Sequence, residues 1–214
     1  MFKNLNVISF VFFISLFCSC SVMKNKNNIS NEVHVEMQTS KGSIIFKLYN
    51  QTPLHRDNFI KLVEENFYNG VTFHRVIKDF MAQAGDPNSK DGSFKGQLGQ
   101  NSKGETIPAE FSNNLFHKKG ALAAARMGDN VNPEKKSSGS QFYIVQGKKY
   151  SLKQLSEMEN RINQNQENIF SFSEAAKKLY QEIGGTPFLD NEYTVFGEVI
   201  KGIEIIDKIC SVET

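Results

Sequence analysis

The chain has 214 residues, of which 39% are hydrophobic and 22% are charged, as is ordinary for a globular protein with one core. A surplus of two basic residues gives a net charge of +2, and no segment gathers Lys and Arg into a basic stripe. This balance argues against proteins that bind nucleic acids or membrane surfaces through positive charge. With 18 Phe and no Trp, the core is expected to be rich in phenylalanine.

The N-terminus has the pattern of an export signal. Lys3 precedes an apolar run from residue 5 to residue 17, which is too short to span a bilayer comfortably. The Ser19-Cys20 junction that follows is similar to the site at which bacterial lipoproteins are cut and lipidated on the cysteine. We therefore predict a lipoprotein-type signal peptide at 1–19 and lipidation of Cys20. An ordinary signal peptide and an uncleaved anchor remain open as alternatives.

A short polar segment separates this signal from the folded part of the chain. Residues 20–31 are rich in Asn and Lys, which predicts a flexible tether. The protein is expected to be exported, periplasmic and lipid-anchored to a bacterial envelope membrane. It would touch that membrane only through its N-terminal lipid or signal. Cys210 would be the single thiol left in the mature domain, so no intramolecular disulfide is expected.

The domain predicted at 32–214 begins with a hairpin and a helix. Apolar and polar residues alternate at 33–37 and at 44–48, as they do in half-buried strands. Thr52 then predicts the N-cap of a helix whose pattern ends at Gly70.

Short strands dominate the rest of the chain, with one exception. Further strands are predicted around a long structured surface loop at 86–111, and a last helix closes the chain. The exception lies at about 150–185, where two apparent capping boxes, Ser151 with Gln154 and Ser171 with Glu174, predict an inserted helical pair. The predicted strands are 71–77, 81–84, 121–126, 141–146 and 193–200, and the predicted last helix is 203–210.

Three segments together carry a family resemblance. They are FHRVIKDFMAQAGD at 73–86, GALAAARMGD at 120–129 continuing to SSGSQFYI at 137–144, and TPFLDNEYTVFGEV at 186–199. The chain resembles the cyclophilin family of peptidyl-prolyl cis–trans isomerases, especially its exported bacterial members. The resemblance implies a mostly β fold, a closed antiparallel eight-stranded β-barrel capped by two α-helices, here with the inserted helical pair.

The resemblance also assigns roles to residues. Arg75 and Gln83 match catalytic positions, with Arg75 as the catalytic arginine. The remaining matches are substrate-binding positions of the pocket, the groove beside it and the rim: Phe80, Met81, Ala125, Arg126, Gln141, Tyr143, Phe188, Leu189 and Tyr193. At Arg126 we expect the backbone to matter more than the side chain. Tyr143 departs from the family's usual phenylalanine and Phe188 from a tryptophan, while Ala84 stands where glycine is usual.

The residue types suit rotation about an X–Pro bond. That bond turns slowly because its partial double-bond character gives a barrier of about 18–20 kcal/mol. Rotation frees the lone pair of a pyramidal prolyl nitrogen, which a guanidinium stabilises only in the transition state. The substrates implied are proline-containing segments of client proteins, and the protein is expected to act as a monomer without a cofactor. The alternatives are a non-catalytic proline-peptide-binding module or holdase and, less favoured, a structural envelope protein.

The four histidines are expected to be structural. Strand alternation predicts that His74 faces away from Arg75. The other three are scattered, without the spacing of metal ligands, so no metal site is predicted: His34, His55 and His117.

Overall fold

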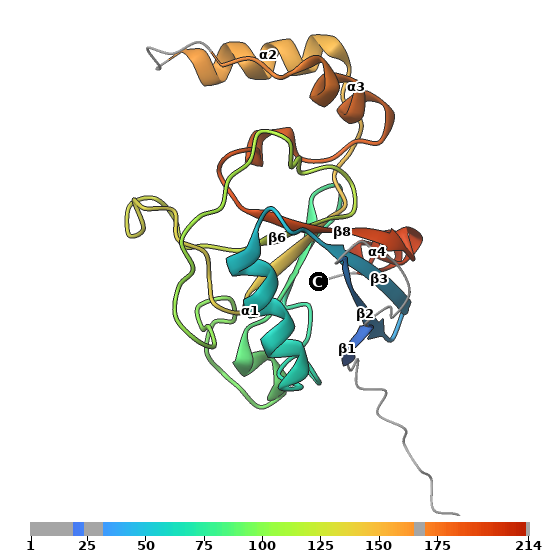
Figure 1. Ribbon diagram of the computed structural model, residues 1–214, viewed down its shortest axis with the longest axis vertical. Coiled ribbons are helices and arrows are strands. Elements are labelled where there is room, and N and C mark those ends of the chain that lie inside the picture. Colours follow the sequence, from blue (N-terminus) through green and yellow to red (C-terminus); the bar gives the residue numbers. More distant parts are fainter. Residues whose placement is uncertain (1–18, 24–31, 165–169, 213–214) are drawn as a thin grey trace, which may run out of the picture.

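The computed structural model describes residues 19–23, 32–164 and 170–212 (Figure 1). One sheet of eight strands, in the order β1-β2-β3-β8-β6-β7-β5-β4, forms the body of the molecule. Every neighbouring pair in it is antiparallel. The strands are β1 (Ser19–Met23), β2 (Val33–Thr39), β3 (Gly42–Leu48), β4 (Arg75–Ile77), β5 (Met81–Ala84), β6 (Ala121–Ala124), β7 (Phe142–Val145) and β8 (Val195–Lys201).

Helices cover the curled sheet and extend one end of it. Figure 1 shows α1 and α4 beside the strands, whereas α2 and α3 stand away from them at the top of the view. The helices are α1 (Pro53–Glu64), α2 (Leu152–Asn163), α3 (Glu174–Glu182) and α4 (Ile203–Cys210), with 3₁₀ turns η1 (Pro87–Lys90) and η2 (Pro187–Leu189). The mostly β fold with an inserted helical pair is confirmed. Closure into a barrel is not, because no pairing joins the outer strands β1 and β4 among the residues described.

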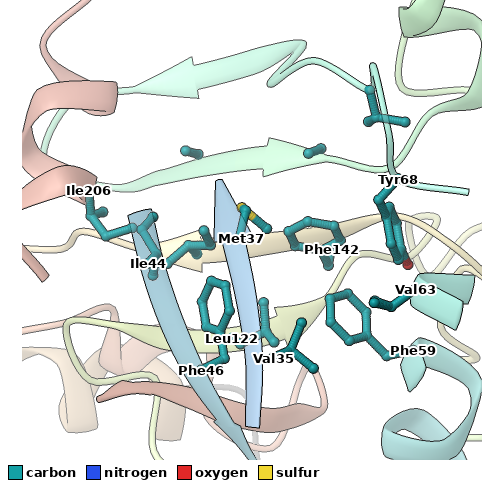
Figure 2. Close-up of a cluster of buried hydrophobic side chains, with 14 of the residues drawn as sticks. Val35, Met37, Ile44, Phe46, Phe59, Val63, Tyr68, Leu122, Phe142 and Ile206 are labelled. Carbon is teal, nitrogen blue, oxygen red and sulfur yellow. The ribbon is translucent and has the colours of Figure 1, made fainter. Parts of the chain in front are cut away.

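The main core follows from the alternation of the first hairpin. Val35 and Met37 of β2 and Ile44 and Phe46 of β3 are all 0% exposed, while their sequence neighbours face outward. Figure 2 shows these side chains packed against phenylalanines and aliphatic residues from α1, β6, β7 and α4. Burying each such side chain contributes about 1.5–3 kcal/mol relative to leaving it exposed. Cys210 also lies in this core with a buried, free thiol.

The start of α1 differs from the prediction. Thr52 occupies the N-cap position but makes no capping bond with its side chain. Glu110, from the long loop, supplies the cap instead, because its carboxylate accepts from the backbone N–H groups of Leu54 and His55 at 3.1 and 3.0 Å. A carboxylate beside the first turn also complements the helix dipole. The helix ends at Glu64 rather than at Gly70, and turns fill the interval.

Most other strands are shorter than their sequence patterns. In the predicted strand at 71–77 the pairing begins only at Arg75, and the strand predicted at 121–126 ends at Ala124. The long loop at 86–111 and the closing helix at 203–210 lie where the sequence placed them.

One capping box is confirmed and one is wrong. Ser151 and Gln154 form the predicted reciprocal box at the start of α2. For α3 the N-cap is Ser173, whose hydroxyl accepts from the Ala176 N–H at 3.2 Å. Ser171 instead bonds Glu159 of α2, because the chain is still crossing between the two helices there.

The segment around the predicted cleavage site forms a strand. Ser19–Met23 pairs with β2, and Cys20 lies opposite Met37. The first residues of the predicted tether are therefore part of the sheet in this structure, since β2 is an otherwise open edge that can accept a strand. The predicted signal at 1–18 and the rest of the tether at 24–31 lie outside the described residues. Within the described part, no helix has the length and apolar character needed to cross a bilayer.

Candidate functional site

A tight hairpin places Arg75 beside Gln83. β4 and β5 pair with Arg75 opposite Gln83, and Asp79 supplies the left-handed turn residue between them with a φ of 60°. The Arg75 Nη1 donates to the Gln83 Oε1 at 3.3 Å. The exposed guanidinium and the amide therefore share one edge of the hairpin.

Gln141 orients the amide of Gln83. Its own Nε2 donates to the backbone carbonyls of Gly99 and Asn101 at 3.1 and 2.7 Å, which leaves its Oε1 facing Gln83. The Gln83 Nε2 donates to that oxygen at 2.9 Å, so the Gln83 Oε1 turns toward Arg75. The chain of amides thus fixes which end of each side chain is acceptor and which is donor.

Strand alternation separates the site from the main core. In β5, Ala82 and Ala84 pack in the main core, whereas Met81 joins a second apolar cluster. In β7, Tyr143 and Val145 face that same second cluster. Because successive side chains point to opposite faces of a sheet, these short strands serve both the core and the pocket.

A pocket of about 520 Å³ opens over the second cluster. All the sequence-predicted site residues line it except Gln141 and Phe188. The apolar residues that line it come from β5, β7, η2 and the turns around them. The predicted residues that line it are Arg75, Phe80, Met81, Gln83, Ala125, Arg126, Tyr143, Leu189 and Tyr193.

The two remaining predicted residues lie next to the pocket. Gln141 lines an adjoining hollow of about 570 Å³ that shares Gln83, Ala125 and Arg126 with the pocket. Phe188 is 45% exposed and stacks on Phe80 with ring centroids 5.8 Å apart. The Arg75 guanidinium lies 6.0 Å from the centre of the Phe80 ring. Phe188 thus supports the pocket wall from outside.

Arg126 acts through its side chain more than we expected. Only 4% of that side chain is exposed, and it stacks 4.5 Å from the centre of the Tyr193 ring. Its guanidinium donates to the Glu192 carbonyl at 2.8 Å and to the Glu192 carboxylate at 3.1 Å. It also donates to Met127 and Asp129. These bonds of the Arg126 side chain join two loops of the rim, and we call them the rim clamp. Our expectation, which concerned the backbone of Arg126, did not include them.

The hydroxyl of Tyr143 points away from the pocket. It lies 3.0 Å from the Nε2 of His117, a histidine that is itself 0% exposed. Burial, with Tyr193 and Asp190 nearby, raises the pKa of Tyr143 well above its ordinary value, so the phenol stays protonated. The ring therefore presents an apolar face to the pocket although the side chain carries a polar group.

His74 does not face away from Arg75 as predicted. It lines the pocket, where its ring packs near Gly99. The alternation argument failed because β4 begins only at Arg75, so His74 is not a strand residue. Burial lowers the pKa of His74, which favours the neutral imidazole.

Sequence reasoning missed a wall of the pocket that the long loop provides. Residues 97–100 also line the pocket. The fully buried Asp86 carboxylate holds this loop, since it accepts from the N–H groups of Gly99 and Asn101 at 2.7 and 3.2 Å. An aspartate two residues after a buried strand was the available signal. No three His, Cys, Asp or Glu side chains gather to hold a metal ion anywhere in the described chain.

Comparison with known proteins gives consistent matches. The family model described as cyclophilin-type peptidyl-prolyl cis–trans isomerase matches residues 34–214. A Staphylococcus saprophyticus protein named "Putative peptidyl-prolyl cis-trans isomerase" is 38% identical over 85% of this chain and 82% of its own length. A protein of the same name from Staphylococcus aureus (strain USA300) is 37% identical over 87% of this chain and 85% of its own length.

Solved structures share the fold at lower identity. A cyclophilin-type isomerase from Cryptosporidium parvum is 23% identical with a TM-score of 0.59, covering 86% of both chains. A second structure of that protein, determined in the presence of the dipeptide Ala-Pro, is 22% identical with a TM-score of 0.56, covering 84% of this chain and 85% of the other.

Proposed function

Since this chain belongs to the cyclophilin-type peptidyl-prolyl cis–trans isomerase family, we propose that its clients are unfolded or partly folded envelope proteins and that Arg75 stabilises the transition state of their X–Pro bonds. The observation that carries the mechanism is the position of the guanidinium. It lies at the edge of an apolar pocket, in a hydrogen-bonded row with Gln83 and Gln141. One charge beside an apolar surface that can hold a proline ring is what the rotation requires.

The chemistry needs no nucleophile and no proton transfer. The planar amide resists rotation with a barrier of about 18–20 kcal/mol because the nitrogen lone pair is delocalised. When the bond twists, the nitrogen becomes pyramidal and its lone pair becomes an acceptor. A guanidinium N–H of Arg75 donates to that lone pair only in the twisted state, so it lowers the barrier rather than tightening ground-state binding.

The pocket holds the ring while the preceding carbonyl turns. Met81, Tyr143 and Leu189 offer an apolar enclosure for the pyrrolidine. The amide of Gln83 is held in one orientation by Gln141, which suits it to hydrogen-bond the substrate backbone on one side of the ring. A ring fixed at one end and a carbonyl guided at the other restrict the motion to rotation about the C–N bond.

The adjoining hollow suits a longer chain than a dipeptide. It continues from Gln83 and Ala125 past Met127 to Val131, which is 71% exposed. Its lining mixes apolar side chains with Ser102, Ser138 and other polar groups, as a surface that binds many sequences requires. The Ala-Pro dipeptide present with the Cryptosporidium protein supports a proline-containing ligand for this pocket.

The test is protease-coupled isomerisation of a short X–Pro peptide by the full chain. An enzyme increases the rate of cis-to-trans conversion in proportion to its concentration. The binding-module alternative is supported if the folded protein binds the peptide without changing that rate. The structural alternative is supported if neither binding nor rate enhancement is found.

The rim clamp leads to a first prediction. We expect Arg126→Gln to lower kcat/KM about three- to tenfold, since it removes charge-assisted bonds that join the Glu192 loop to the Met127 loop. The measurement is the coupled assay with the melting temperature as a check of folding. Arg161→Gln, the same change on an exposed position of α2, is the matched control and should leave kcat/KM unchanged. Equal activity of both variants would contradict a role for the clamp.

The envelope location rests on the N-terminal pattern. We propose that Cys20 carries lipid, which would hold the domain at a membrane through β1. Cys20→Ser is expected to abolish incorporation of a labelled fatty acid and to release the protein from the membrane fraction. Cys18→Ser, a neighbouring cysteine two positions earlier, should retain both. Membrane retention without label in the unaltered protein would instead indicate an uncleaved anchor, and soluble cleaved protein an ordinary signal peptide.

A further inference from the structure

The inserted helical pair has a small core of its own. Leu155 of α2 and Tyr180 of α3 are both 0% exposed, and Phe172 and Ala176 complete the cluster. The Tyr180 ring packs in this apolar cluster, and its hydroxyl donates to the Asp190 Oδ2 at 2.6 Å.

Asp190 connects the insertion to a histidine under the pocket. Its Oδ1 accepts from the backbone N–H of His117 at 2.9 Å and lies 2.9 Å from the His117 Nδ1. The Nε2 on the other side of that ring lies 3.0 Å from the Tyr143 hydroxyl. A continuous polar chain thus runs from Tyr180 through Asp190 and His117 to Tyr143, the floor of the pocket.

The chemistry of Asp190 fixes the direction of the bonds it makes. A carboxylate oxygen accepts, so the Tyr180 hydroxyl donates to Asp190, and the His117 Nδ1 carries the proton that faces it. The other ring nitrogen of His117, Nε2, then pairs with the Tyr143 hydroxyl. The side chains of His117 and Asp190 are 0% and 8% exposed, so water does not compete effectively for these bonds.

Backbone contacts tie the same segments together. The Thr186 N–H donates to the His117 carbonyl at 2.8 Å, and the Tyr150 N–H donates to the Tyr180 carbonyl at 3.1 Å. Gly185 packs so closely on His117 that an added Cβ would lie 2.1 Å from its carbonyl oxygen. The segment that leaves the insertion is therefore fixed against the loop that carries His117.

Asp190 also follows the pocket wall directly in sequence. Leu189 is the last residue of η2 and lines the pocket, and Asp190 is its C-cap. The polar chain thus holds two sides of the pocket at once, the wall through Leu189 and the floor through Tyr143. Neither contact uses a group that touches the reacting bond.

We propose that Tyr180 of the inserted helical pair is a positioning residue for isomerisation, which holds Leu189 and Tyr143 against the proline ring through Asp190 and His117. This inference rests on the proposed function. Rotation requires a stationary ring, whereas entry of the ring into the pocket depends mainly on apolar burial. Loss of a hydrogen bond in this polar chain is therefore expected to slow rotation of the bound peptide more than it weakens peptide binding.

The experiment compares Tyr180→Phe, Tyr143→Phe and the double variant in the full chain. Exchange spectroscopy on an X–Pro peptide separates the dissociation constant from the rate of catalysed rotation. We expect Tyr180→Phe to lower the rotation rate about three- to tenfold and to change the dissociation constant less than about twofold. In the Tyr143→Phe background the same substitution should cause a smaller loss of rate than it does alone, because Tyr180 then acts only through Asp190 and the adjoining Leu189.

A matched control and the unfavourable outcomes complete the test. Tyr150→Phe removes a hydroxyl from the same insertion outside the chain, and it should match the unaltered protein in both quantities. An unchanged rate in Tyr180→Phe, or an equal loss in the Tyr143→Phe background, overturns the proposal. If Tyr180→Phe fails to fold, Asp190→Asn takes its place with the same expectation and the same overturning result. An unaltered protein without activity would refute the proposed function instead, so the two failures are distinguishable.

Discussion

Arg75→Ala is expected to lower kcat/KM for X–Pro isomerisation about 100- to 1000-fold, the loss typical of removing a preorganised donor to a charge-bearing transition state. The guanidinium is exposed and its hydrogen bond to Gln83 is long, at 3.3 Å, so its removal should barely change stability. Peptide affinity should also change little, since the lone pair that Arg75 stabilises exists only in the twisted state. The coupled assay, a peptide titration and a melting curve measure these three quantities.

Two further variants define what Arg75 contributes. Arg75→Lys keeps the charge but loses the planar fork of donors, so we expect it to recover only a minor part of the activity. Lys78→Ala removes an exposed cation from the turn of the same hairpin and should leave activity unchanged. If Arg75→Ala retained full activity, the transition-state role would be wrong. If it bound peptide as before while neither protein accelerated rotation, the chain would be a recognition module.

The family resemblance predicted the pocket residues, and the alternation of strand β5 explains which face each one occupies. From Met81 to Ala84 the side chains alternate, and the structure places Met81 and Gln83 at the pocket and Ala82 and Ala84 in the core. Because alternation is a local property of a strand, it can be inferred without knowledge of the fold. The family motifs then supplied the roles that alternation alone cannot assign.

Features that depend on where a strand begins, or on distant partners, could not be predicted in this way. To predict the orientation of His74, one would need to know that β4 begins at Arg75. The ends of a strand depend on its pairing with other strands rather than on local sequence. The cap of α1 comes from Glu110, more than fifty positions away. The clamp of Arg126 and the chain from Tyr180 to Tyr143 likewise join residues whose proximity only the folded structure reveals.

The departure from the family motif at Ala84 has a structural explanation. Ala84 is a strand residue that is 2% exposed, and its methyl group packs in the main core. The next residue, Gly85, has a φ of +101°, a conformation that side-chain-bearing residues rarely adopt. Alanine is thus accommodated at position 84, whereas position 85 requires glycine.

Gly85→Ala is therefore expected to be severely destabilising. A Cβ at this position would lie 2.2 Å from the Ser140 carbonyl oxygen and 2.7 Å from the Gln141 Cα. Backbone strain and overpacking each cost about 1–3 kcal/mol, so we expect a loss of about 3–5 kcal/mol in the free energy of unfolding. For a chain of this size that corresponds to a melting temperature lower by about 10 °C, measured by circular dichroism.

The same substitution should also reduce activity in the molecules that remain folded. The backbone at Ser140 and Gln141 must move away from the new methyl group, and Gln141 is the residue that orients Gln83 at the pocket. Gly92→Ala is the matched control, because nothing lies within 4 Å of a Cβ built there, and it should keep both stability and activity. A melting temperature for Gly85→Ala close to that of Gly92→Ala would show that the turn after β5 can relax. In that case the close approach of Gly85 to Ser140 would not be what fixes Gln141, and its orientation would rest on the loop carbonyls of Gly99 and Asn101 alone.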